Sequence, residues 1–129
     1  MSEKVVVKYC SPTLAGLKTG SLFSYSYEEK DEVYNFLRKL NRSLKYKGVR
    51  CIPLRMKNNK ALIYVFRPSM LKIDFKNQNV KEMLKKQGYC TNNCDKCLIK
   101  LMKRLENKDD FPHEIGFFLG YPVEETNGQ

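Results

Sequence analysis

The 129 residues are enough for one modest hydrophobic core and too few for two. Hydrophobic residues make up 42% of the chain and charged residues 29%, which is typical of a folded globular protein and excludes a disordered one. No apolar run approaches the roughly twenty residues that a membrane-spanning helix needs. We therefore expect a single globular domain over residues 1–129, with no membrane partner.

The cysteines and the N-terminal residues indicate a reducing compartment. The chain holds five cysteines, an odd number that does not suit a framework of paired disulfides. Residues 1–7 lack the long apolar core of a signal peptide. The sequence therefore predicts a cytoplasmic protein with free thiols.

Positive charge is unevenly distributed. The net charge is +10, but it is +15 up to Leu105 and −5 over the remaining residues. Eleven Lys or Arg residues and no acidic residue lie between Glu32 and Asp74. A field of this sign attracts phosphate-bearing partners, although it does not select among them.

The first quarter of the chain predicts two strands and a short helix between them. Residues 4–9 are apolar and β-branched, which favours a buried strand. Ser11 can cap a helix over residues 13–18, with Pro12 in its first turn. Residues 21–27 follow as a second strand with an aromatic face.

The strongest helical pattern spans about residues 28–46. Its acidic residues lie at the start and its basic residues at the end, as the helix dipole favours. Five residues form one apolar stripe: Val33, Phe36, Leu37, Leu40 and Leu44.

Residues 49–56 and 61–67 predict two strands of a hairpin, joined by a polar turn at residues 57–60. Pro53 cannot donate a backbone hydrogen bond, so the first of these strands is expected at a sheet edge or with a bulge. Pro68 ends the hairpin.

The C-terminal half predicts helices. Short helices are expected near residues 69–76 and 80–87, and a longer one over about residues 93–106. Residues 111–120 suit a helix capped by Asp110 or a buried strand, and we favour the helix. The whole pattern predicts an α/β or α+β fold, with one mixed sheet of four to five strands and helices packed on it.

Cys10 is expected between a strand and a helix N-terminus. Such a position offers unpaired backbone N–H groups and a positive dipole end, which bind anions and lower a thiol pKa. The alternative is that Cys10 is a small apolar residue at a strand end. The candidate anion-binding residues are Cys10, Ser11, Thr13 and Lys18.

His113 is the only histidine, and it is followed by Glu114. A histidine can act as a base near neutral pH, so Cys10, His113 and Glu114 form a candidate catalytic set of nucleophile, base and orienting carboxylate. The alternative is that the His113–Glu114 pair satisfies backbone groups at the start of its own helix.

Residues 10–18, C-S-P-T-L-A-G-L-K, and residues 111–122, F-P-H-E-I-G-F-F-L-G-Y-P, resemble the two signatures of an uncharacterised family, domain of unknown function 3793. That family is found mostly in anaerobic Gram-positive bacteria. The resemblance implies a shared site or turn geometry at the two motifs, but no activity. Family members usually continue well past the Gly-Tyr-Pro motif, so the resemblance implies a short or C-terminally truncated member.

Cys90, Cys94 and Cys97 have a spacing that also holds iron–sulfur clusters in radical enzymes. The chain is too short for such an enzyme, and no glycine-rich cofactor motif follows. A structural zinc with His113 as a distant fourth ligand is the remaining metal hypothesis. The alternative is that two of the three thiols line the core, because Cys94, Cys97 and Leu101 share a helix face. Any other cofactor stays unknown.

Arginines, lysines and tyrosines alternate in the acid-free stretch. Basic side chains neutralise phosphates and aromatic rings stack on bases, which suggests a nucleic-acid surface. No helix-turn-helix, zinc-finger or RRM pattern supports it, and a solvated basic face has the same composition. The candidate residues are Arg38, Arg42, Lys45, Arg50, Arg55 and Arg67.

Three functions follow. The leading one is a binding or regulatory module that takes an anionic small molecule between the Cys10 turn and the His113 segment. The alternatives are a nucleic-acid-binding protein and a thiol-dependent enzyme using Cys10 and His113. The balance leans away from an enzyme, and a protein partner stays open.

Overall fold

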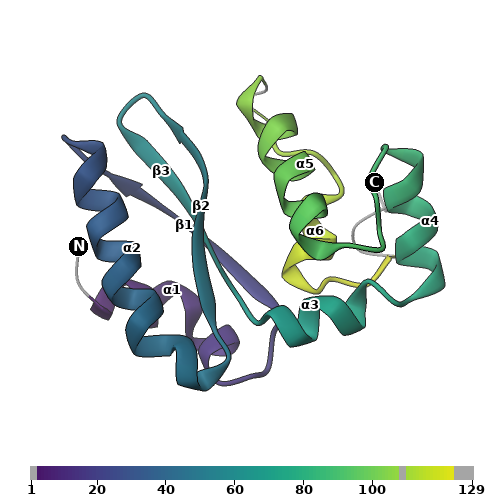
Figure 1. Cartoon of the computed structure of the whole chain (residues 1–129), viewed down its shortest axis with the longest axis horizontal. Coiled ribbons are helices and arrows are strands. Elements are labelled where there is room, and N and C mark those ends of the chain that lie inside the picture. The colour runs from purple at the N-terminus through teal and green to yellow at the C-terminus, as the bar shows by residue number, and fades with distance from the viewer. Residues whose placement is uncertain (1–2, 108–109, 124–129) are drawn as a thin grey trace. The chain divides into compact units, whose positions relative to one another are not determined.

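The computed structural model describes residues 3–107 and 110–123. The chain divides into two compact units, Met1–Pro68 and Ser69–Gln129. The elements of the first unit, shown in Figure 1, are α1 (Glu3–Leu14), β1 (Gly20–Ser26), α2 (Lys30–Leu44), the 3-10 helix η1 (Lys45–Lys47), β2 (Arg50–Lys57) and β3 (Lys60–Phe66). Those of the second are α3 (Pro68–Asp74), α4 (Gln78–Lys86), α5 (Cys94–Glu106) and α6 (Ile115–Leu119). The fold is mixed α/β.

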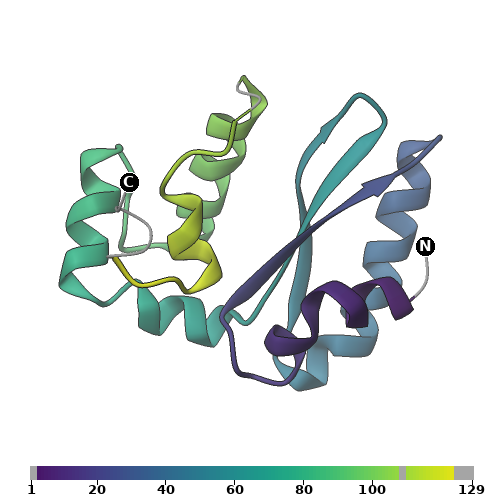
Figure 2. The same ribbon diagram turned by 180° about the vertical axis from the view of Figure 1, so that it is seen from behind.

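The first unit is built on an antiparallel sheet with strand order β1-β3-β2. The sheet has three strands among the described residues, where the sequence predicted four to five. Helices α1 and α2 cover one face of it, as Figures 1 and 2 show from opposite sides. Alternate residues of β3, Ala61, Ile63 and Val65, point to this face and pack in the same core as Val33 and Leu37 of α2.

The hairpin and the second helix confirm their predictions. Strand β2 lies at a sheet edge, and its pairing with β3 shifts register between Pro53 and Arg55. Proline lacks the N–H that regular pairing needs, so an edge position and a bulge both accommodate it. Asn58 and Asn59 form the turn with φ angles of 54° and 59°, a conformation that asparagine tolerates better than most residues.

The predicted strand at residues 4–9 is wrong, because this segment belongs to helix α1. The buried residues of α1 are Val6, Cys10 and Thr13, which recur at the spacing of one helical face. The predicted helix over residues 13–18 is also absent, since α1 ends at Leu14 with Pro12 in its last turn. The structure therefore has neither the strand predicted at residues 4–9 nor the helix N-terminus predicted beside Cys10.

The second unit consists of helices in its described part. The Phe75 and Phe118 rings meet edge to face with centroids 5.1 Å apart, and Tyr89 lies 5.9 Å from Phe118. Helix α6 confirms the helical choice for residues 111–120, but it is shorter than expected and its N-cap is Glu114 rather than Asp110. Within the described ranges, no helix is both long enough and apolar enough to cross a membrane.

Candidate functional site

The N-terminal motif lies at the C-terminal end of α1, which reverses the electrostatics expected there. Ser11 is exposed, and its hydroxyl donates to Val7 O within the helix at 2.7 Å. Thr13 is buried and shares a 2.7 Å hydrogen bond with the Ser21 hydroxyl. The carbonyls at a helix C-terminus favour cations, so the helix-dipole argument for anion binding by Cys10, Ser11, Thr13 and Lys18 no longer applies.

Arg67 occupies this helix end. Its Nε and Nη2 donate to the carbonyls of Thr13 and Leu14, each at 2.7 Å. Its Nη1 donates to Lys47 O, also at 2.7 Å. A planar guanidinium suits this bridging of several carbonyls. Arg67 therefore ties the end of α1 to η1 through one hydrogen bond from each of its three guanidinium nitrogens, and its role in nucleic-acid binding stays a prediction.

Cys10 is fully buried in α1. Burial raises the pKa of its thiol from the ordinary 9.0 to about 11, against smaller opposing effects of Lys18 and of a hydrogen bond with Ser21. Such a thiol is protonated at neutral pH and is a poor nucleophile. This environment favours the core reading of Cys10. His113 belongs to the other unit, and both the Cys10–His113 pair and the pocket between these motifs stay predictions.

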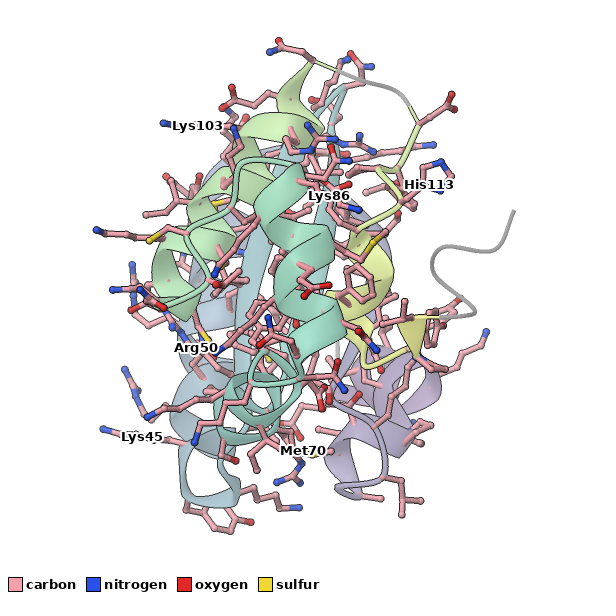
Figure 3. The ribbon with its side chains drawn as sticks, turned by 90° about the vertical axis from the view of Figure 1, so that its right-hand side faces the viewer. Lys45, Arg50, Met70, Lys86, Lys103 and His113 are labelled. Atoms are coloured by element: carbon pink, nitrogen blue, oxygen red, sulfur yellow. The ribbon has the colours of Figure 1, made fainter. Side chains whose placement is uncertain are left out.

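His113 and Glu114 have different surroundings. His113 is exposed, and its side chain points outwards in Figure 3. Glu114 is 4% exposed; it accepts a 3.0 Å hydrogen bond from Tyr89 and forms an ion pair with Arg104. Burial and then the Glu114 charge raise the pKa of Tyr89, which keeps this phenol protonated and able to donate. The Glu114 carboxylate therefore joins its own segment to Tyr89 and α5.

The three cysteines of the second unit differ in exposure. Cys90 is exposed, Cys94 is half-buried and Cys97 is buried, with its Sγ 3.2 Å from Cys90 O. Residues 3–107 and 110–123 contain no group of three or more Cys, His, Asp or Glu side chains that could hold a metal ion. The described structure thus does not assemble Cys90, Cys94 and Cys97 into the zinc site that their spacing suggested.

The remaining predicted nucleic-acid residues lie on the first unit. Arg38 and Arg42 are exposed on successive turns of α2, and Lys45 continues the same line into η1. Figure 3 shows Lys45 extending outwards. Arg50 is exposed with its guanidinium 6.0 Å from the Phe66 ring centre, and Arg55 is half-buried on the same strand.

A pocket of about 440 Å³ lies within the second unit, between α3, α4 and the start of α5. Its charged lining is three lysines and one aspartate, a net charge of +2. The lining residues are Lys72, Phe75, Lys76, Lys81, Thr91, Asn92, Asn93, Cys94 and Asp95.

Two features of this pocket bear on what it could bind. Thr91 is 8% exposed, and its buried Oγ1 has no hydrogen-bond partner among the described residues. The first turn of the 13-residue helix α5 forms part of the wall through Cys94 and Asp95. Asn93 caps this helix by accepting from Lys96 N at 3.1 Å. A helix N-terminus with lysines nearby is a favourable place for an anion.

The first unit also has pockets, of about 540 and 250 Å³. The larger is lined by Glu3 and Glu32 as well as Lys39, which does not favour an anion. Among the described residues that line these two pockets, no buried side-chain nitrogen or oxygen lacks a hydrogen-bond partner. The pocket of the second unit is therefore the candidate site.

Sequence patterns gave only weak signals for this pocket. Lys72 and Lys76 are spaced by four residues in the predicted helix 69–76, and Asn93 begins the predicted helix 93–106. Lysines at such spacing usually lie on a solvated helix face. Nothing local marks Thr91 as a buried hydroxyl.

A family model described as protein of unknown function, DUF3793, matches residues 6–128. The chain belongs to the DUF3793 family. The match includes the pocket residues and nearly all of both units. No curated protein and no solved structure gives a significant match to this DUF3793 chain.

Proposed function

We propose that this DUF3793 protein is a binding module for a small phosphate-bearing molecule, held in the pocket of α3, α4 and the start of α5. The observation that carries the proposal is the buried Thr91 hydroxyl, which has no partner among the described residues and lies in a positively charged pocket. An unsatisfied buried hydroxyl costs about 1–3 kcal/mol. This hydroxyl has almost no accessible surface, so a rotation of the Thr91 side chain towards the pocket is needed before a phosphate oxygen can accept its hydrogen bond and remove that cost.

The charges and the size of the pocket support a phosphate ester. Lys72, Lys76 and Lys81 come from three successive segments and supply ammonium donors, while the N-terminal dipole of α5 adds positive potential. Asp95 opposes them with one negative charge, so the lining favours a monoester over a more highly charged polyphosphate. The volume of about 440 Å³ lies within the roughly 300–1,000 Å³ typical of organic-ligand sites. The ligand class is the one expected from the sequence, but its position is different.

The Thr91→Val variant tests the central observation. Valine has nearly the shape of threonine and lacks the hydroxyl, so the fold should be retained. A hydrogen bond to a charged oxygen is worth about 1.5–3 kcal/mol, which predicts affinity for inorganic phosphate and glycerol phosphate at least about tenfold weaker than in the wild type. Calorimetric titration measures it. Equal affinity in the two proteins would show that the hydroxyl does not contact the ligand.

The lysines are tested with a charge-matched control. Lys72→Ala/Lys81→Ala should weaken phosphate binding by about 1–3 kcal/mol, since two charged donors leave the pocket. Lys86→Ala/Lys103→Ala removes the same charge from α4 and α5 at positions outside the pocket, which Figure 3 labels. Equal losses in the two double variants would point to general electrostatic attraction, and no binding by the wild type would refute the proposal.

A second candidate function is binding of single-stranded nucleic acid by α2. Tyr34, Arg38, Arg42 and Lys45 are exposed and follow one line along the helix into η1. Such a line can neutralise successive phosphates and offer one ring for base stacking. Neither Arg67 nor the phosphate pocket is needed for it.

Fluorescence anisotropy with a labelled single-stranded oligonucleotide tests this second function. Arg38→Glu/Arg42→Glu should weaken binding strongly and reduce its salt dependence, whereas Lys57→Glu/Lys60→Glu at the exposed hairpin turn should have a smaller effect. Equal effects of the two variants would mean that only net charge matters.

A further inference from the structure

We propose that Cys94 and Cys97 form a dithiol site in the wall of the phosphate pocket, where a small anionic disulfide oxidises them to an intramolecular disulfide. The expectation that bound phosphate slows this oxidation rests on the proposed function. The oxidation itself does not.

The positions of the two cysteines satisfy the main geometric requirement. Cys94 is the first residue of α5 and Cys97 lies three residues later in the same turn. Helix geometry places Cα atoms at this spacing about 5 Å apart. Disulfides join Cα atoms that are roughly 4.4–6.8 Å apart, so the pair can close with side-chain rotation and little movement of the backbone.

Exposure assigns different roles to the two thiols. Cys94 is half-buried and lines the pocket, so a reagent that enters the pocket meets it first. Cys97 is fully buried, and its Sγ lies 3.2 Å from Cys90 O, on the inner side of the same turn. Cys94 is therefore the attacking thiol and Cys97 the resolving thiol.

The reaction is a balanced thiol–disulfide exchange. The Cys94 thiolate attacks one sulfur of the small disulfide, so that a mixed disulfide forms and the first small thiolate leaves. Cys97 then loses its proton, a step that its raised pKa of about 11 makes slow, and its thiolate attacks the Cys94 sulfur, which closes the Cys94–Cys97 bond and releases the second small thiolate. The protein gives up two electrons and two protons, and the small disulfide becomes two thiols.

The charges around Cys94 influence which small disulfide reacts and how fast the exchange is. Burial and then Asp95 raise the pKa of Cys94, while Lys72 lowers it. The reduced pair is thus mainly protonated near neutral pH, so it exchanges slowly with any disulfide that is not concentrated beside it. The lysines of the pocket should concentrate an anionic disulfide beside Cys94, which favours glutathione disulfide over neutral hydroxyethyl disulfide.

The site is tested on the full chain by peptide mapping. Reduced protein is incubated with glutathione disulfide, free thiols are alkylated and the protein is digested with trypsin. Cleavage after Lys86, Lys96 and Lys100 leaves the new disulfide joining peptides 87–96 and 97–100. Because Cys90 lies in the first peptide, Cys90→Ser serves as the matched control for Cys94→Ser.

We expect the linked peptides from the wild type and from Cys90→Ser, and none from Cys94→Ser. A wild type that yields no linked peptides, or a link that is lost in Cys90→Ser, would overturn the inference. Because the first of these results needs no variant, a serine variant that fails to fold does not prevent a decision.

Inorganic phosphate separates this inference from the proposed function. When phosphate is added at constant ionic strength, the rate of disulfide formation should decrease and stay proportional to the fraction of pockets that are empty. If phosphate binds and the rate is unchanged, Cys94 does not share the phosphate site and that part of the inference fails. If phosphate does not bind but the linked peptides form, the proposed function fails and the dithiol site stands.

Discussion

At the scale of single residues, Glu114 is the clearest case of a side chain whose surroundings define its role. Its buried carboxylate is paired with Arg104, whose side chain is 24% exposed, and accepts from Tyr89. Replacing Glu114 by Gln leaves Arg104 without a counter-charge in a partly buried position. We expect the free energy of unfolding to fall by about 2 kcal/mol, less than for a fully buried pair. Urea denaturation measures it.

Two further variants show whether the ion pair accounts for the loss of stability in Glu114→Gln. Tyr89→Phe removes one hydrogen bond to the carboxylate and should lower stability by about 1–2 kcal/mol. Glu106→Gln removes the same charge from an exposed position at the end of α5 and should change stability by less than about 0.5 kcal/mol. If Glu114→Gln is no less stable than Glu106→Gln, the ion pair is not what fixes this segment.

At the scale of elements, Arg67 determines how α1 ends. Its three hydrogen bonds reach the last turn of α1 and η1 from the residue that follows β3. Arg67→Lys keeps the charge but offers a single donor group, which cannot reach all three carbonyls. We expect a loss of about 2 kcal/mol in urea denaturation, whereas Arg42→Lys on the exposed face of α2 should be neutral. Equal stability of the two variants would contradict this role of Arg67.

The same element shows where sequence patterns mislead. Val5, Val6 and Val7 are β-branched and favour a strand locally, yet the segment is helical. Burial of Val6, Cys10 and Thr13 along one helix face outweighs that preference, because Val6 and Cys10 belong to the core beneath the sheet. Helix α2 and the hairpin could be predicted because propensity, apolar spacing and turn residues agree there.

The candidate site was harder to predict, because it depends on tertiary packing. Lys72, Lys81 and Thr91 come from α3, α4 and a loop, and no sequence period links them. The Thr91 hydroxyl lacks a partner among the described residues only because folding removes it from water. The cysteines, by contrast, could be singled out from spacing alone, but only the structure shows that no metal-binding group of three such side chains is assembled in its described part.

At the scale of the whole molecule, buried thiols should make the protein sensitive to alkaline pH. Burial raises the pKa of Cys10 and of Cys97 to about 11 and that of Cys51 to about 12, from an ordinary value of 9.0. A folded state that holds these protons more tightly gains stability from them below about pH 9. This contribution is lost as the pH rises from about 9 through the raised values, because the unfolded chain releases the protons first.

Urea denaturation at a series of pH values measures this effect. Above about pH 9 the free energy of unfolding should decrease. The decrease should be less steep for Cys51→Ala than for the wild type, because this variant lacks one thiol with a raised pKa. Cys90→Ala serves as the control, since Cys90 is exposed, and should follow the wild type. Lysine deprotonation near pH 10.4 would lower the net charge of +10 and its self-repulsion, which acts in the opposite direction. The same slope in the wild type and in Cys51→Ala would therefore exclude the buried thiol as the cause.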